Sequence, residues 1–215
     1  MRGYYSAVLL LAGGCLRVLT RYSVRGRKHV PLHGGVIVAS NHASYFDPPL
    51  LACAAPREVH FLAKEELFRI PAFGALIRSV NAIPIRRGVA DLSGLSRATE
   101  RLRAGAALLM FPEGSRMRDG ELHSARPGVG MMAVQADVPI VPAYVSGSHR
   151  EKDWFTRGVR VRVTFGPARP WRELAGADSD LTPGRALYQR IGAAVMREIA
   201  LLKAEQERSA SRGAA

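Results

Sequence analysis

Short apolar runs alternate with amphipathic stretches from residue 36 onward, and this alternation constrains the fold more than any other feature of the sequence. Most of the runs are rich in Val, Ile, Leu and Ala, which predicts strands buried in a sheet. Strands are expected at 36–39, 59–63, 82–85, 107–111, 139–145 and 159–165. Strands that alternate with helices predict an α/β fold with a mostly parallel central sheet flanked by helices.

Helix signals lie between the strands. Asp47 before Pro48 is typical of a helix start, because Asp is favoured at the N-cap and Pro in the first turn. Further helices are predicted at 71–78, 92–102, 129–136 and 183–202. We expect a membrane-associating helix at 1–22, one α/β domain at 23–206 and a frayed tail at 207–215, since chain ends rich in small and charged residues are poorly ordered.

Composition and charge narrow the classes of partner. The chain of 215 residues is long enough to bury a hydrophobic core without disulfide bonds or structural metal ions. Its two cysteines exclude a disulfide scaffold and a four-cysteine zinc site. A formal net charge of +13 implies an acidic partner, which is nucleic acid, anionic lipid or a phosphorylated substrate. Residues 1–46 contain basic side chains but no Asp or Glu, so part of this charge is concentrated near the N-terminus.

The N-terminal segment contains an uncharged apolar run at 3–16. This run is shorter than the ~20 residues that a membrane-spanning helix needs. Tyrosines at one end and arginines at the other suit a membrane interface, so the functional interpretation is an interfacial helix with a basic flank. Two alternatives stay open: a helix packed on the core of the domain, and a lipoprotein signal ending at Cys15.

A polar block follows the first predicted strand, where ligands of parallel sheets bind. In this block His42 precedes Asp47 by five residues. In a continuous helix the two side chains would point about 140° apart, but Pro48 disfavours a helical Asp47. We therefore expect a turn that folds the carboxylate onto the imidazole, fixing its tautomer and raising its basicity. The alternative is an N-cap Asp beside an unrelated surface His.

Three further blocks follow or begin later strands. Glu113, Gly114 and Arg116 lie behind the run at 107–111, where a glycine lets backbone approach a ligand, and a plain turn is the alternative. The neighbouring Arg86 and Arg87 suit a phosphate, or form a solvated pair. The rigid apolar stretch at 138–142 either lines a hydrophobic channel or belongs to the core.

In order and type, these blocks resemble the motifs of the glycerolipid acyltransferases (PlsC-like), most closely the bacterial 1-acyl-sn-glycerol-3-phosphate acyltransferase type. The blocks are Asn-His-x-Ser-x-x-Asp at 41–47, Gly-x-Ile-x-Ile-x-Arg at 81–87 with Asn81 in place of Gly, Phe-Pro-Glu-Gly-Ser-Arg at 111–116, and Val-Pro-Ile-Val-Pro at 138–142. The likeness covers roughly residues 30–147, just over half of the chain.

The resemblance implies roles for the matching residues. It makes His42 the catalytic base and Asp47 the carboxylate that orients it. Arg87 and Arg116 are implied to bind the acceptor phosphate, with Glu113 positioning the glycerol. The remaining matches are Asn41 and Ser44 as supports of the catalytic pair, Gly114 and Ser115 in the phosphate-binding block, and Val138, Pro139, Ile140, Val141 and Pro142 as the acyl pocket. Asn81 tolerates the left-handed backbone of a glycine but leaves the acceptor specificity open.

The implied reaction transfers a fatty acyl group from acyl-CoA or acyl-carrier protein to lysophosphatidic acid, giving phosphatidic acid in phospholipid biosynthesis. No bound cofactor and no metal is expected, because the histidines lack close ligand spacing. The expected location is the cytoplasmic face of the cell membrane, peripheral or monotopic, on an anionic lipid surface.

Two alternatives to this reaction remain. The first is the same chemistry on another lysophospholipid, a glycolipid or an aminolipid. The second is a basic nucleic-acid-binding module. We expect no nucleic-acid partner, because the sequence has no stacking aromatic motif, helix-turn-helix signature or zinc finger.

Overall fold

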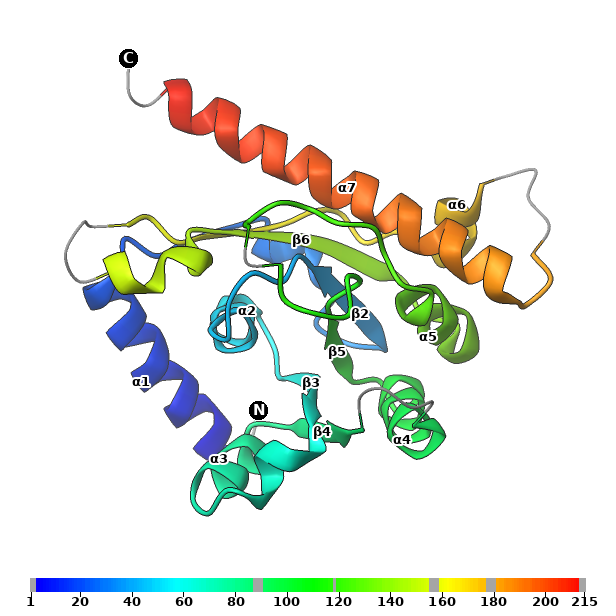
Figure 1. The fold of residues 1–215 in the computed structure, drawn as a ribbon, viewed down its shortest axis with the longest axis horizontal. Coiled ribbons are helices and arrows are strands. Elements are labelled where there is room, and N and C mark those ends of the chain that lie inside the picture. The colour runs from blue at the N-terminus through cyan, green and yellow to red at the C-terminus, as the bar shows by residue number, and fades with distance from the viewer. Residues whose placement is uncertain (1–2, 87–90, 118, 155–158, 177–180, 213–215) are drawn as a thin grey trace.

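A seven-stranded sheet forms the centre of the computed structural model (Figure 1), which describes all residues except 1–2, 87–90, 118, 155–158, 177–180 and 213–215. The strands are β1 (Ser23–Arg25), β2 (Val36–Ser40), β3 (Val59–Lys64), β4 (Ala82–Ile85), β5 (Ala107–Met110), β6 (Ile140–Ser146) and β7 (Arg162–Phe165). Their order is β1-β7-β6-β2-β5-β3-β4; the β6–β7 pairing is antiparallel and the other pairings are parallel. The predicted α/β fold with a mostly parallel sheet is confirmed.

Helices cover both faces of this sheet, giving three layers. The α-helices are α1 (Gly3–Leu19), α2 (Asp47–Ala54), α3 (Phe73–Ser79), α4 (Leu92–Arg103), α5 (Gly128–Ala136), α6 (Trp171–Ala175) and α7 (Arg185–Arg212), and 3-10 helices span η1 (Arg27–His29), η2 (Glu65–Arg69) and η3 (Ser148–Asp153). Successive side chains of a strand point to opposite faces. Accordingly Ile37 packs in the cluster beneath α4, α5 and α7, whereas Val38 packs in the cluster beneath α2.

All six predicted strands are present, and the short elements β1 and α6 and the three 3-10 helices among the described residues were not predicted. β1 has three residues and α6 has five, so neither is long enough to show a hydrophobic period. β7 begins at Arg162 rather than at Val159, although the carbonyl oxygens of Val159 and Val161 already accept backbone hydrogen bonds from Arg21 N and Ser23 N.

The N-terminal helix α1 packs on the domain and also presents an apolar surface. Tyr5 is buried, and its hydroxyl accepts a hydrogen bond from Val59 N at 3.1 Å. Leu9 packs against the cluster beneath α2, while Leu10 and Leu11 are each 75% exposed. One face of α1 is therefore packed on the domain, as one of the alternatives expected, and another face is exposed to solvent. No helix among the described residues has the length and apolar character needed to span a bilayer.

The C-terminal helix does not end where a frayed tail is predicted. α7 continues to Arg212, past the expected boundary at 207. The reason is Gln206, whose buried amide donates to Thr164 Oγ1 at 2.7 Å and accepts from Ser146 Oγ at 2.7 Å. These bonds join the last turns of the helix to β6 and β7. Local composition carries no sign of such distant partners, so the sequence places the end of the domain earlier than the end of the helix.

Candidate active site

The polar blocks after β2 and β5 lie side by side at the carboxyl edge of the sheet. β2 and β5 pair in register, with Ala39 opposite Met110, so the chain leaves both strands at the same level. His42 therefore lies next to Phe111, and the two rings stack with centroids 3.9 Å apart and an interplanar angle of 16°. This is the edge at which parallel α/β sheets bind ligands.

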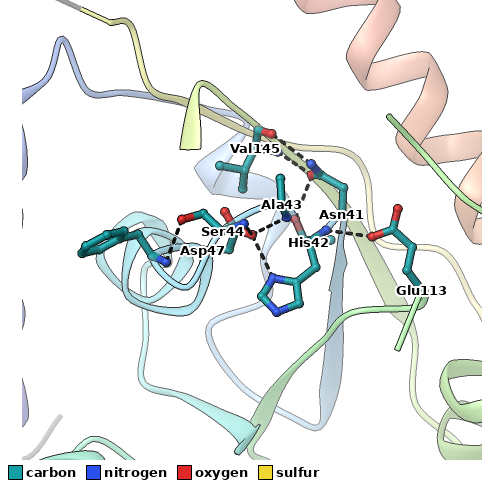
Figure 2. A network of polar contacts seen from close by, with 9 residues as sticks. Asn41, His42, Ala43, Ser44, Asp47, Glu113 and Val145 are labelled. Atoms are coloured by element: carbon teal, nitrogen blue, oxygen red, sulfur yellow. Dashed lines mark hydrogen bonds and ion pairs between the residues drawn. The ribbon is translucent and has the colours of Figure 1, made fainter. Parts of the chain in front are cut away.

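The predicted contact between His42 and Asp47 is present (Figure 2). Nδ1 of His42 lies 2.8 Å from Oδ2 of Asp47, and both side chains are buried. The same oxygen accepts from the backbone N–H groups of Ala43 at 2.7 Å and Ser44 at 2.8 Å. The alternative of an N-cap Asp beside an unrelated surface His is thus wrong, because the carboxylate turns back toward the residues that precede α2.

This geometry sets the tautomer of the imidazole. A carboxylate oxygen only accepts hydrogen bonds, so Nδ1 of His42 must carry the proton that it donates to Asp47. The lone pair of the neutral ring is then on Nε2, which can accept a proton from a bound molecule. The stacked Phe111 ring covers one face of the imidazole and limits its rotation.

Glu113 contacts the protein backbone rather than an open cavity. Its Oε2 accepts from His42 N at 2.9 Å and its Oε1 from His123 N at 3.1 Å, and the residue is 2% exposed. Burial raises the pKa of the Glu113 carboxyl, and the two backbone hydrogen bonds act in the opposite direction. Oε2 thus fastens the loop after β5 to the loop after β2, and Oε1 holds the later part of the same β5–α5 connection, while the expected role in positioning glycerol stays a prediction.

Asn41 extends the sheet by one step beyond β2. Its Nδ2 donates to Val145 O at 3.0 Å, and its Oδ1 accepts from Val145 N at 2.8 Å (Figure 2). The side chain thereby pairs with β6 as a further strand residue would, directly before His42. Ser44 Oγ accepts from Phe46 N at 3.2 Å inside the turn. Both predicted supports stabilise the backbone around the imidazole.

The block at 111–116 contains a contact that the sequence did not predict. The guanidinium carbon of Arg116 lies 3.3 Å from the ring centroid of Tyr45, which is 73% exposed. Tyr45 stands between His42 and Asp47 in the sequence, but its spacing alone gives no reason to pair it with a residue 71 positions away. Gly114 has φ +73°, a conformation that L side chains rarely adopt.

Three other residues of the predicted blocks remain to be placed. Arg87 lies outside the described residues, and Ser115 is half-buried beside Arg116. Asn81 has φ +66°, as expected for a residue that replaces a glycine. No three His, Cys, Asp or Glu side chains among the described residues are grouped as a metal site would require.

The stretch predicted to form the acyl pocket lies in and just before β6. Val138 precedes β6, and Pro139 to Pro142 form its amino-terminal approach and first residues. β6 runs parallel to β2, with Ile140 opposite Ile37 and Pro142 opposite Ala39, so the stretch begins near the amino ends of these strands and approaches the level of His42 only at Pro142. Ile140 and Val141 are fully buried. Val138, Ile140 and Val141 therefore belong to the core, as the alternative interpretation expected, and the role of the stretch as an acyl pocket stays a prediction.

Comparisons with known proteins agree with this geometry. The model of the family described as Acyltransferase matches residues 21–146. The chain is 26% identical over 160 residues to a 1-acyl-sn-glycerol-3-phosphate acyltransferase of Bacillus subtilis, covering 74% of this chain and 75% of the relative. It is 31% identical over 160 residues to the Streptococcus pneumoniae protein of that name, covering 70% of this chain and 59% of the relative.

A solved structure has a similar fold over nearly the whole chain. The crystal structure of the 1-acyl-sn-glycerophosphate acyltransferase PlsC from Thermotoga maritima superimposes with a TM-score of 0.73 at 26% identity, covering 95% of this chain and 84% of that chain. A Limnanthes douglasii protein, also a 1-acyl-sn-glycerol-3-phosphate acyltransferase, is 31% identical over 67% of this chain, which spans only 53% of that relative.

Proposed function

Because the chain belongs to the acyltransferase family, whose model matches more than half of it, we propose that it transfers a fatty acyl group from an acyl thioester to the free hydroxyl of 1-acyl-glycerol-3-phosphate. It is an O-acyltransferase of phospholipid biosynthesis, and its product is phosphatidic acid. The observation that carries the proposal is the buried pair in which Asp47 accepts from Nδ1 of His42 at 2.8 Å.

The pair supplies a general base. Nε2 of His42 takes the proton of the acceptor hydroxyl while the hydroxyl oxygen attacks the thioester carbonyl carbon. The new C–O bond forms, the C–S bond breaks, and the proton passes from the imidazolium to the leaving thiolate. Asp47 stabilises the imidazolium in between. A positioned base of this kind contributes about 10²–10⁴-fold to the rate.

The transfer proceeds without an acyl-enzyme intermediate. Burial raises the pKa of the Cys53 thiol to about 11, so the thiol stays protonated near neutral pH and is a poor nucleophile. Its Sγ donates to the carbonyl oxygen of Leu9 in α1. Direct attack by the activated acceptor is the simpler chemistry for the groups present.

The acceptor phosphate is bound by Arg116 together with Arg87. The guanidinium of Arg116 stacks over the ring of Tyr45, which follows His42 by three residues in the sequence. This stacking holds a positive charge near the base and the hydroxyl that it deprotonates. The acyl donor is acyl-CoA or acyl-carrier protein, and no resident cofactor or metal takes part. The protein works on the cytoplasmic face of the cell membrane as a peripheral or monotopic enzyme, with α1 in contact with anionic lipid.

The test is acyl transfer to lysophosphatidic acid by the wild type and by His42→Ala, followed as thiol release. We expect the variant to lose at least a hundredfold in kcat, because the base is absent. Exposed His33→Ala serves as the control. Turnover of His42→Ala close to that of the wild type would contradict the proposal.

A further inference from the structure

The segment between β3 and β4 presents apolar side chains to solvent. Ile70, Phe73 and Leu76 are 49%, 43% and 44% exposed, and the last two lie three residues apart, on one side of α3. The helix is held by its other side, where Ile77 packs with Phe68 and Ala63. The outward row is therefore not needed to attach α3 to the domain.

Basic residues surround this apolar row. The exposed cations of the segment and its exit are Lys64, Arg69, Arg78 and Arg86, and the acidic residues are Glu65 and Glu66. Arg86 lies 3.8 Å from Glu65, and the guanidinium of Arg78 lies over the Phe68 ring at 5.2 Å. Apolar side chains flanked by an excess of arginine and lysine suit an anionic lipid surface, where the rings and alkyl groups enter the acyl region and the cations remain among the headgroups.

The segment lies on the same face of the sheet as the imidazole of His42. Phe61 packs both with the cluster that holds α3 and with the cluster beneath α2. Phe111, which stacks on His42, also packs against the cluster beneath α2, and so does Leu9 of α1. Figure 1 shows α1 and α3 on the side of the sheet opposite to α7. In addition, η2 starts at the carboxyl end of β3, the edge that carries the site.

We propose that residues 65–79, comprising η2 and α3, form a second lipid-docking element beside α1, and that its occupant is an anionic bilayer. Ile70, Phe73 and Leu76 enter the membrane, and Arg69 and Arg78 contact the lipid phosphates. The proposal rests on the proposed function, because a lyso-lipid acceptor stays in the bilayer. Docking through α3 as well as α1 brings the edge that carries His42 against the surface from which that acceptor comes.

Tryptophan fluorescence tests the insertion directly. Trp154 and Trp171 are buried, so a tryptophan introduced by Phe73→Trp is the exposed reporter once the wild-type spectrum is subtracted. With vesicles of phosphatidylglycerol and phosphatidylcholine we expect a blue shift of its emission and quenching by brominated acyl chains. The matched control is Leu201→Trp on α7, which is 64% exposed on the opposite face and should show neither change. Equal responses at both positions, or none at position 73, would overturn the proposal.

Substitution of the row tests its contribution to binding and turnover. We expect Ile70→Ser/Phe73→Ser/Leu76→Ser to bind these vesicles at least tenfold more weakly than the wild type, and Leu201→Ser to bind normally. Arg69→Gln should weaken binding about fivefold, which corresponds to ~1 kcal/mol for one cation at an anionic surface. Unchanged sedimentation of the triple variant would show that α1 docks alone.

A short-chain lysophosphatidic acid that is soluble as a monomer separates docking from chemistry. The triple variant should acylate it at the wild-type rate while losing activity on the vesicle-bound acceptor. Equal loss on both acceptors would overturn the docking role, because the row would then serve the site itself. If the wild type itself acylates neither acceptor, the proposed function fails, and the fluorescence result still decides whether residues 65–79 insert.

Discussion

A single oxygen of Asp47 organises the turn that carries the base. Oδ2 accepts from Nδ1 of His42 and from two backbone N–H groups, while Oδ1 is buried without a hydrogen-bond partner among the described residues. The carboxylate thus fixes the loop and the imidazole together. Unpaired buried polar atoms are rare in native proteins, and their presence is common where function constrains the chain.

Asp47→Asn tests this arrangement at nearly constant volume. An amide can keep one acceptor oxygen, but it lacks the negative charge that stabilises the imidazolium. We expect kcat to fall by about 10²–10⁴-fold with a smaller change in KM for the acceptor. Thermal unfolding of the variant, followed by circular dichroism, distinguishes lost catalysis from lost structure. A kcat within a few-fold of the wild type would exclude the charge as a catalytic contribution.

Tyr45 offers a second prediction at this scale. A cation over an exposed aromatic ring contributes about 0.5–1 kcal/mol, so losing the ring should misplace the Arg116 guanidinium and raise KM for lysophosphatidic acid about two- to fivefold. Tyr45→Phe keeps the ring and should behave as the wild type, whereas Tyr45→Ala should not. A 1-acylglycerol acceptor, which has no phosphate, should be used equally by all three proteins. Equal effects of Tyr45→Ala on both acceptors would contradict this role.

The residues of the site differ in how far sequence could predict them. The His42–Asp47 contact was predictable, because Pro48 constrains the backbone before it and the two residues are close in the chain. The orientation of Glu113 was not, since its hydrogen bond to His42 N depends on the register between β2 and β5. The contact of Arg116 with Tyr45 likewise joins two loops that only the folded sheet brings together.

At the scale of elements, the sequence predicted the helices that begin with a capping residue and the strands and helices whose apolar residues recur at a regular spacing. Asp91 is an example: its carboxylate accepts from Gly94 N at 3.1 Å and so caps α4. It also accepts from Arg86 N at 2.8 Å, which ties the end of β4 to the start of α4. The first contact follows from the sequence, and the second follows from the crossover between two elements.

Asp91 makes the stability of the molecule depend on pH in a defined direction. Hydrogen bonds from Arg86 N, Gly94 N and Ser93 Oγ lower the pKa of its carboxyl in the folded state. Its contribution is therefore complete above the unfolded pKa of about 4 and is lost as the pH falls below that value. We expect the difference in Tm between the wild type and Asp91→Asn to be largest near pH 7 and to shrink below about pH 4. A difference that is constant from pH 7 to pH 3 would contradict this assignment.

At the scale of the whole molecule, composition predicted an acidic partner but not the surface that meets it. The net charge of +13 is compatible with several partners, and only the fold places α1 and α3 on the same side of the sheet. That placement depends on the crossover connections of the sheet, which no local pattern contains. The alternation of strands and helices did predict the layers themselves.

Binding to lipid should therefore depend on both salt and lipid charge. Electrostatic screening shortens from about 8 Å at 0.15 M salt to about 3 Å at 1 M. We expect sedimentation with phosphatidylglycerol vesicles to weaken at least tenfold over this range, and the weak binding to pure phosphatidylcholine to change little. Binding to both vesicle types with the same salt dependence would show that the basic residues do not contribute.

The attachment of α1 has a consequence for where the enzyme works. Its first turn is held by Tyr5 at Val59, and the chain just after its last turn is held by the bond from Arg21 N to Val159 O at 3.3 Å. A helix pinned at both ends cannot swing independently of the sheet. Once α1 settles at a given depth in a bilayer, the height of His42 above the lipid headgroups is set as well. With α1 docked as proposed, we expect acceptors to be selected by how far their hydroxyl lies from the membrane plane.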